Sequence, residues 1–314
     1  MSKNKLLITG GSGLVGYGIK EIMKENNKYK IIYLSSKDCN LEKFDETLTF
    51  FKKVKPKYVI HLAACVGGLF KNMNCKVEML EKNININSNV LKACHETDVK
   101  KVISCLSTCI FPDKTSYPID ESMLHNGPPH NSNYAYAYAK RLLEIHAKVY
   151  QEQFNKDFIC VIPTNIYGPN DNYSLTDGHV IPALIHRCYL AKKQGIDFVV
   201  KGSGKPLRQF IYSLDLARLM IWVLEEYKKR ETIILSVGEK DEVSIKKVAE
   251  EISINFDYKH RISFDTTAAD GQYKKTANNK KLVSLHPELK FISIQEGIKE
   301  TVDWFIKNID ICRK

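Results

Sequence analysis

The feature that most restricts the fold of this chain is a cluster of glycines near its start, in the string LLITGGSGLVG. An apolar run precedes the glycines, and a segment with helical periodicity follows them. Gly11, Gly13 and Gly16 fit G-x-G-x-x-G, and Gly10, Gly13 and Gly16 equally fit G-x-x-G-x-x-G. Both spacings suit a strand that turns tightly into a helix, whose first N–H groups can bind a pyrophosphate. We therefore expect a dinucleotide site at Gly10, Gly11, Ser12, Gly13, Leu14, Val15 and Gly16.

Short apolar runs alternate with longer periodic segments over the first half of the chain. The pattern predicts strands at 6–9, 30–34, 58–63, 102–106 and 158–163. It predicts helices at 14–24, 41–53, 77–95 and 136–154. Such alternation is typical of a parallel sheet with helices on both faces. The fold class is therefore expected to be α/β, with a Rossmann-like doubly wound parallel sheet.

The rhythm changes after Gly168, where loop residues precede a further helix that ends near residue 193. We expect a dinucleotide-binding domain over residues 1–167, completed by later segments at about 209–240. Residues 168–314 should form a smaller C-terminal lobe that mainly binds substrate. Ligands of open α/β sheets bind beyond the carboxyl ends of the strands, so a lobe there would close a cleft.

The chain is basic, with 47 Lys and Arg against 36 Asp and Glu and a net charge of +11. This excess suits an anionic partner, such as nucleic acid, a membrane surface or a phosphorylated small molecule. The basic residues are scattered, which argues against a nucleic-acid-binding arm. No apolar stretch approaches the roughly 18 residues of a membrane span. We expect neither nucleic acid nor membrane as a partner.

Nine cysteines are present, without a C-x-x-C pair, and several lie in apolar stretches. An odd number without such pairs argues against a disulfide framework and against a zinc site. The apolar run near the start is too short for a signal peptide. We expect a cytoplasmic protein that binds no metal.

The residues after the second expected strand indicate which dinucleotide binds. NAD sites usually have an acidic residue there for the ribose 2′-hydroxyl. Ser35, Ser36 and Lys37 instead offer two hydroxyls and a cation, which suit a 2′-phosphate. We expect NADPH, bound in part by Ser36 and Lys37. Alternatively, Lys37 is an ordinary solvated lysine, and Asp38 and Asn40 meet the adenine side.

A second motif suggests proton chemistry. Tyr136 and Lys140 form Y-x-x-x-K, which puts both side chains on one helix face, and Ser107 follows the strand at 102–106. A tyrosine pKa near 10 would be lowered by the lysine cation and by an oxidised nicotinamide. Tyr136 could then give a proton to a carbonyl oxygen that Ser107 holds while hydride arrives. On its own, a Y-x-x-x-K motif usually marks only one face of a helix. The glycine turn and Ser107 favour the catalytic interpretation here.

This combination resembles the extended short-chain dehydrogenase/reductases, which act on nucleotide sugars. The likeness runs from residue 6 to about residue 305, and its strings include SCLSTCIFP, NGPPHNSNYAYAYAKR, VIPTNIYGPNDNY, DGHVIPALIHR, RQFIYSLDLA and LSVGEKDEVSIK. They are similar to those of the family's bifunctional epimerase-reductases. The resemblance implies NADPH-dependent 3,5-epimerisation and 4-reduction of GDP-4-keto-6-deoxy-D-mannose to GDP-L-fucose.

The resemblance also implies roles for Cys109 and His179, the pair that exchanges protons at carbons 3 and 5 of the sugar. A thiol titrates near 8.5 and an imidazole near neutrality, and both values suit proton exchange. Without the resemblance, Cys109 would more often be a small buried hydrophobic residue, and His179 would more often cap a loop.

Other contacts follow from the resemblance alone. Cofactor contacts are expected at Ala63, Ala64, Lys140, Pro163, Thr164, Asn165, Ile166 and His179. Substrate contacts are expected at Asn165, Arg187, Lys201, Arg208 and Asn278. Arg187 and Arg208 would hold the diphosphate with their forked donors, the alternative being solvated surface arginines. Some relatives carry Trp where this chain has Lys201, and some carry Asp where it has Asn278.

In the family, two long helices that correspond to 77–95 and 136–154 pair across a two-fold axis, so we expect a homodimer. Their apolar residues could otherwise be simple core-facing stripes.

Two rival functions remain. The first is a 4-epimerase or 4,6-dehydratase of the same superfamily, which would keep tightly bound NAD. Lys37, Cys109 and His179 argue against this function. A non-catalytic NADP-binding regulator would usually lack Tyr136 or Lys140.

Overall fold

A six-stranded parallel sheet forms the centre of the larger lobe. The computed structural model describes residues 3–268, 270 and 272–314. In chain order the strands are β1 (Asn4–Thr9), β2 (Tyr29–Leu34), β3 (Tyr58–His61), β4 (Lys101–Cys105), β5 (Asp157–Pro163) and β10 (Ile233–Leu235). In space they follow the order β10-β5-β4-β3-β1-β2, and each neighbouring pair is parallel. The expected doubly wound α/β fold is confirmed.

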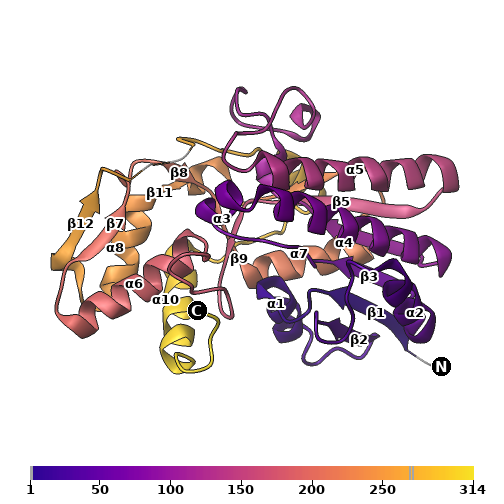
Figure 1. Ribbon diagram of the computed structural model, residues 1–314, viewed down its shortest axis with the longest axis horizontal. Helices are drawn as coiled ribbons and strands as arrows, with labels where there is room; N and C mark the ends of the chain where they lie inside the picture. The colour runs from indigo at the N-terminus through magenta and orange to yellow at the C-terminus, as the bar shows by residue number, and fades with distance from the viewer. Residues whose placement is uncertain (1–2, 269, 271) are drawn as a thin grey trace.

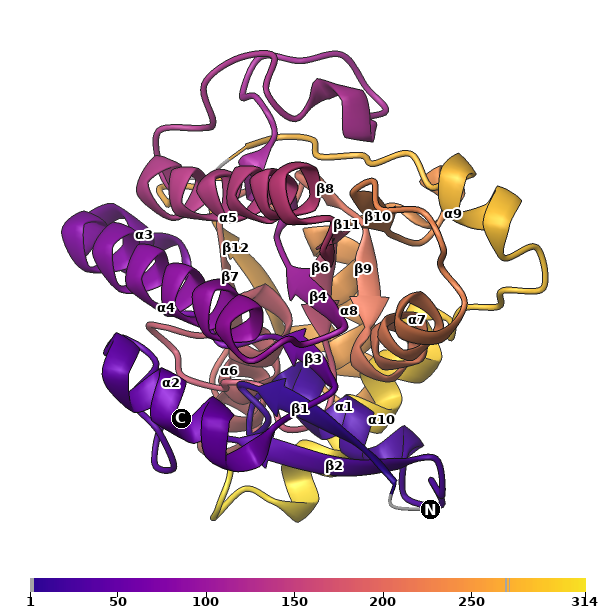
Figure 2. The ribbon, with the colours of Figure 1, turned by 90° about the vertical axis from the view of Figure 1, so that its right-hand side faces the viewer.

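Helices cover both faces of this sheet, which explains the continuous apolar runs of its strands. One face carries α2 (Phe44–Val54), α4 (Lys76–Glu96) and α5 (Tyr134–Phe154), whose buried residues share a core with Leu7 and Val102. The other face carries α1 (Leu14–Ile22), α7 (Ser213–Glu225) and α9 (Lys280–Leu285). Figure 2 shows α4 and α5 side by side on the first face and α1 and α7 on the second.

The strand order creates a switch point at the carboxyl edge of the sheet. From β1 the chain passes to β2 on one side, and it then crosses to β3 on the other side of β1. The connections leave in opposite directions there, so the loops after β1 and β3 diverge and open a crevice.

The smaller lobe has its own apolar core. It contains α6 (Val180–Gln194), α8 (Ile245–Asn255), α10 (Ile294–Lys307) and two-stranded sheets from β6 (Asn165–Tyr167) with β9 (Phe210–Tyr212), β7 (Phe198–Lys201) with β12 (Ile262–Asp265), and β8 (Leu207–Arg208) with β11 (Val243–Ser244). Figure 1 shows most of these elements at the left, away from the large sheet. Pro182 lies in the first turn of α6, where its missing N–H costs no hydrogen bond.

Element boundaries differ from the sequence-based expectations by a few residues. The helix expected from residue 41 begins at Phe44, because Glu42 and Lys43 form a turn whose N–H groups donate to Asn40. The strand expected to reach residue 63 ends at His61. The short helix α3 (Leu69–Asn74) was not expected. Four short 3₁₀ turns complete the described elements: η1 (Thr108–Ile110), η2 (Glu121–Met123), η3 (Glu239–Asp241) and η4 (Lys259–Arg261).

Candidate active site

A cavity of about 880 Å³ opens at the carboxyl ends of the central strands, and residues of both lobes line it. The expected site residues that line it are Gly10, Ser12, Gly13, Leu14, Val15, Gly16, Ser36, Ala63, Ala64, Ser107, Cys109, Tyr136, Lys140, Pro163, Thr164, Asn165, Ile166, His179, Arg187, Lys201 and Arg208. This volume lies in the upper part of the range of about 300–1,000 Å³ that is usual for small-molecule and cofactor sites.

The glycine turn approaches its neighbours too closely for side chains. Gly10 has a φ of +68°, and a Cβ there would lie 2.8 Å from the Ala63 backbone nitrogen. A Cβ on Gly16 would collide with the carbonyl oxygen of Gly11. Gly13 is the N-cap of α1, and no side chain caps this helix. The first backbone N–H groups of α1 therefore lie at the cavity without a side-chain acceptor. The turn therefore offers a cradle for an anion.

A buried polar network holds the strand ends beside this turn. The Thr9 hydroxyl oxygen accepts hydrogen bonds from the N–H groups of Leu62 and Ala63, both at 3.2 Å. Both lone pairs of Thr9 are then used, so its O–H donates to His61 Nδ1 at 2.7 Å. His61 Nε2 donates in turn to Asn87 Oδ1 at 3.1 Å. Burial, with the nearby Lys140 charge, lowers the pKa of His61 to about 3, so the ring is neutral.

Tyr136 and Lys140 lie on the cavity face of α5, as their spacing predicts. The Lys140 ammonium donates to the Cys105 carbonyl oxygen at 2.8 Å and lies 5.8 Å from the centre of the Tyr136 ring. The expected lowering of the tyrosine pKa depends also on an oxidised nicotinamide, and it stays a prediction. Burial raises the pKa of Tyr136 well above its ordinary value, and burial lowers the pKa of Lys140. Desolvation is therefore the largest influence on the pKa of both groups.

Ser107 and Cys109 enter the cavity from the turn after β4. The Ser107 side chain caps η1 by accepting from the Cys109 N–H at 3.4 Å. Cys109 is buried, and this burial raises the pKa of its thiol. The charges of Lys275 and Lys140 and the Ser107 hydroxyl oppose that rise. A short 3₁₀ turn thus places a hydroxyl and a thiol in the cavity that Tyr136 also lines.

His179 reaches the cavity from the smaller lobe. It is the exposed N-cap residue of α6, and its side chain makes no capping hydrogen bond. Close by lies Asp171, which is buried; its Oδ1 accepts from the Asn172 N–H at 2.7 Å, while its Oδ2 has no partner among the described residues. Burial raises the pKa of Asp171, and the charge of His179 opposes this rise.

Comparisons with known proteins agree with this geometry. The model of the NAD dependent epimerase/dehydratase family matches residues 6–238. The chain belongs to this family.

The chain is similar to several relatives over its whole length. It is 56% identical to a GDP-L-fucose synthase of Dictyostelium discoideum, with 100% of this chain and 98% of the relative covered. It is 32% identical to the GDP-L-fucose synthase of Escherichia coli K12, with 99% of both covered. The crystal structure of a GDP-L-fucose synthetase from Naegleria fowleri bound to NADP has a TM-score of 0.95 at 50% identity, with 100% of this chain and 96% of that chain covered.

The two arginines that the resemblance places at the diphosphate, Arg187 and Arg208, differ in how firmly they are held. Arg208 donates to three backbone carbonyls, those of Leu207, Tyr273 and Gln272, at 2.7, 3.3 and 2.6 Å. Among the residues that the structure describes, Arg187 donates only to the Val199 carbonyl, at 3.4 Å. Burial lowers the pKa of both guanidinium groups, which nevertheless stay charged. Both guanidinium groups therefore line the cavity from the smaller lobe.

Three expected site residues do not line the cavity. Gly11 packs against Tyr33, where a Cβ would approach the tyrosine Cβ to 2.7 Å. Lys37 is exposed in the loop after β2. Asn278 accepts from the Lys280 N–H at 2.9 Å, and its own N–H donates to Ile119. Ligand contact by these residues stays a prediction.

The cavity also contains polar residues that the sequence analysis did not find, among them Asp171, Lys275 and Arg313. No motif marks them, because each comes from an irregular segment whose position depends on tertiary contacts.

In residues 3–268, 270 and 272–314, no group of three or more His, Cys, Asp and Glu side chains is arranged to hold a metal ion. Within those same residues, no helix has the length and apolar character needed to span a membrane.

Proposed function

We propose that this chain is a GDP-L-fucose synthase, which uses NADPH to epimerise GDP-4-keto-6-deoxy-D-mannose at carbons 3 and 5 and to reduce its 4-keto group. The observation that carries the proposal is the meeting of Cys109, His179 and Tyr136 in the cavity that the glycine turn also lines. The full-length likeness to two GDP-L-fucose synthases supports the same substrate.

The residues of the larger lobe fit a dinucleotide. The close packing at Gly10 and Gly16 leaves room for a pyrophosphate against the open N-terminus of α1. We propose that Ser36 and Lys37 bind the 2′-phosphate. The neighbouring Asp38 supports this choice, because its carboxylate already accepts from the Ser35 N–H at 2.8 Å and from the Ser35 hydroxyl at 2.6 Å. NADPH bound there would supply the hydride for carbon 4.

Epimerisation needs a base on one face of the sugar and an acid on the other. The 4-keto group makes the protons on carbons 3 and 5 acidic once its oxygen is polarised. We assign Cys109 as the base that removes such a proton and His179 as the acid that returns one from the opposite side. Cys109 comes from the large sheet and His179 from the N-terminus of α6, so a sugar between the lobes would lie between them.

Reduction uses the groups on α5. We propose that the Ser107 hydroxyl holds the 4-oxygen and that Tyr136 donates its proton to this oxygen as hydride reaches carbon 4. Burial raises the pKa of Tyr136, so the phenol is protonated and ready to donate. Lys140 is fixed by the Cys105 carbonyl and would hold the nicotinamide side of the dinucleotide.

The GDP part would lie in the smaller lobe. Arg187 and Arg208 would meet the diphosphate, with Lys201 and Asn165 nearby in the same cavity. We therefore propose that residues 1–167 with 209–240 bind NADPH, and that residues 168–314 mainly bind the sugar nucleotide. The entry of β10 and α7 into the larger lobe supports the discontinuous boundary.

We also propose that the enzyme is a homodimer that works in the cytoplasm. Tyr138, Leu142, Ile145 and Val149 on α5 are 42–45% exposed and recur every three or four residues. Such a stripe on the outer side of the α4–α5 pair suits contact with a second copy across a two-fold axis. The free state of all nine cysteines supports a reducing compartment.

One assay tests the function. Purified protein is mixed with NADPH and GDP-4-keto-6-deoxy-D-mannose in deuterated water, and the nicotinamide absorbance and the sugar are followed. We expect NADPH oxidation and deuterium at carbons 3 and 5. Tyr136→Phe should stop hydride transfer and spare deuterium uptake, and Cys109→Ser should stop the uptake. Wild-type uptake in Cys109→Ser would contradict the base assignment. Turnover without NADPH consumption would indicate a 4-epimerase or dehydratase instead.

A further inference from the structure

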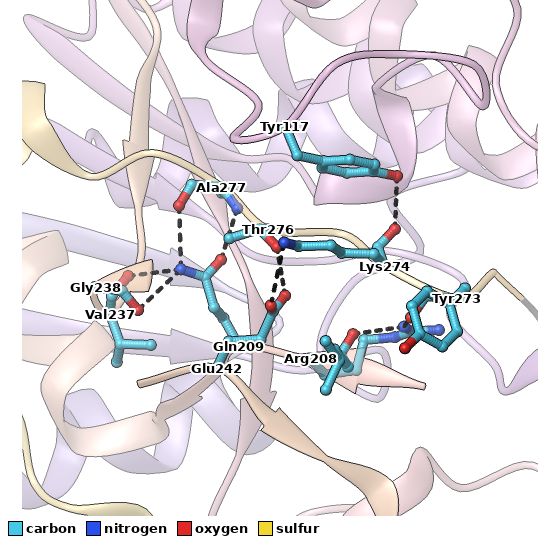
Figure 3. A network of polar contacts seen from close by, with 11 residues as sticks. Tyr117, Arg208, Gln209, Val237, Gly238, Glu242, Tyr273, Lys274, Thr276 and Ala277 are labelled. Carbon is cyan, nitrogen blue, oxygen red and sulfur yellow. Dashed lines mark hydrogen bonds and ion pairs between the residues drawn. The ribbon is translucent and has the colours of Figure 1, made fainter. Parts of the chain in front are cut away.

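Residues 272–278 form an irregular segment beside the cavity, and hydrogen bonds fix it just before Lys275. The Tyr273 carbonyl oxygen accepts from the Leu207 N–H at 2.9 Å and from the Arg208 guanidinium at 3.3 Å. The Lys274 carbonyl oxygen accepts from the Tyr117 hydroxyl at 2.7 Å. Figure 3 shows these anchors converging on the segment from separate elements.

The segment is fixed equally firmly just after Lys275. The Ala277 N–H donates to Gln209 Oε1 at 2.7 Å, and Gln209 Nε2 donates back to the Ala277 carbonyl at 3.1 Å (Figure 3). The Thr276 carbonyl accepts from the Ile119 N–H at 2.8 Å. Since both sides of Lys275 are anchored, its backbone has little freedom to redirect the side chain.

The side chains on either side of Lys275 point away from the cavity. Lys274 Nζ lies 3.9 Å from a Glu242 oxygen, and the Thr276 hydroxyl donates to Glu242 at 2.5 Å (Figure 3). Alternate side chains of an extended segment face opposite sides, so Lys275 points the other way. It accordingly lines the cavity, whereas Lys274 does not.

Lys275 is partly buried and makes no hydrogen bond or ion pair with any residue that the structure describes. The charged and titratable groups around it are Cys109 from η1, Arg208 from β8, and Asp113. Those around Cys109 are Lys275, together with Lys140, Tyr136 and Arg141 from α5. The Lys275 ammonium thus has the Cys109 sulfur among its few electrostatic neighbours.

We infer that Lys275 is a positioning residue whose ammonium stabilises the thiolate form of Cys109 and so adjusts the base that removes protons from the substrate. The catalytic part of this inference rests on the proposed function, whereas the coupling between the two side chains does not. The segment that carries Lys275 supplies a charge to a thiol far away in the sequence.

The electrostatics of the cavity support this assignment. Burial raises the pKa of Cys109, and among the influences that oppose the rise the charge of Lys275 is the largest, ahead of the Ser107 hydroxyl and Lys140. Burial also lowers the pKa of Lys275, as does the charge of Arg208, whereas Cys109 and Asp113 favour the charged ammonium. Without Lys275, burial of the thiol would be opposed mainly by Ser107 and Lys140.

The test measures how fast iodoacetamide alkylates Cys109 from pH 6 to pH 11 in the substrate-free, full-length protein, with each cysteine read by peptide mass spectrometry. Only the thiolate reacts, so the midpoint of the rate reports the thiol pKa. We expect Lys275→Met to raise the midpoint by about one unit and to slow alkylation at pH 7 about tenfold. Lys275→Gln is the second neutral variant, in case the Met variant folds poorly.

Two variants control for effects other than charge. Lys275→Arg keeps the cation and should keep the wild-type midpoint, and Lys274→Met removes a neighbouring cation that does not line the cavity and should also keep it. Cys94 and Cys160, buried in the core, should stay unreactive in every folded variant. An unchanged midpoint in the neutral variants, or the same rise in Lys275→Arg, would overturn the inference.

Deuterium uptake separates this inference from the proposed function. Uptake at carbons 3 and 5 should follow the same shift in pH dependence in Lys275→Met. A shifted Cys109 midpoint in a protein that takes up no deuterium would refute the function and leave the coupling intact. Wild-type uptake together with an unshifted midpoint would refute the coupling and leave the function intact.

Discussion

Acidification should destabilise this protein through one buried side chain, His61. The ring has 1% of its surface exposed; its Nδ1 accepts the Thr9 O–H, and its Nε2 donates to Asn87. Protonation would put a hydrogen on Nδ1 against the Thr9 hydroxyl, which has no spare lone pair. Folding therefore requires the neutral ring, in accord with a pKa of about 3.

The magnitude follows from linkage. The unfolded chain protonates His61 below about pH 6.5, whereas the folded protein resists protonation down to about pH 3. Between these values the unfolded state binds more protons, so the stability is present above pH 6.5 and is lost as the pH falls. At about 1.4 kcal/mol per pH unit, the fall from pH 7 to pH 5 costs about 2 kcal/mol.

The assay is urea unfolding at pH 7 and pH 5, followed by circular dichroism, for wild type and His61→Gln. The variant loses hydrogen bonds at both pH values. Between pH 7 and pH 5, however, its free energy of unfolding should change about 2 kcal/mol less than that of the wild type. Val59→Ala, on the same strand, is the control, since it removes buried methyl groups and keeps His61. Equal pH dependence in wild type and His61→Gln would refute the reasoning.

Two further changes test the proposed contacts. Lys37→Ala should weaken NADPH binding about tenfold and leave NADH binding nearly unchanged, because only NADPH carries the 2′-phosphate; equal losses in fluorescence titrations with both would contradict the role of Lys37. Ile145→Asp should turn the expected dimer into a monomer by placing a carboxylate in the apolar stripe of α5, as read by light scattering after size exclusion. A dimer that survives this charge would locate the interface elsewhere.

The sequence was most informative where the signal is local. The glycine spacing predicted the strand–turn–helix at Gly10–Gly16, and the i, i+4 spacing predicted that Tyr136 and Lys140 share one face of α5. The residues that line the cavity include most of those suggested by the family resemblance. Short-range geometry decides these features, because helix periodicity and backbone freedom depend only on neighbouring residues.

Other expectations depend on the environment more than on the motif. Lysine beside tyrosine suggested a lowered pKa for Tyr136, yet burial raises it. The resemblance suggested Asn278 as a substrate contact; its side chain caps the turn before α9, and the contact stays a prediction. Nothing in the lysine-rich string YKKTANNKK distinguishes Lys275 from Lys274.

By itself, the sequence determined the parallel sheet, the dinucleotide turn and the helix that carries the phenol, since each depends on spacing within one short segment. Only the tertiary structure decided the protonation of His61 and Tyr136 and which of the two lysines, Lys274 or Lys275, lines the cavity. The physical reason is that desolvation and charge act through space. The groups responsible come together only when β3, η1, α5 and the segment at 272–278 pack around one cavity.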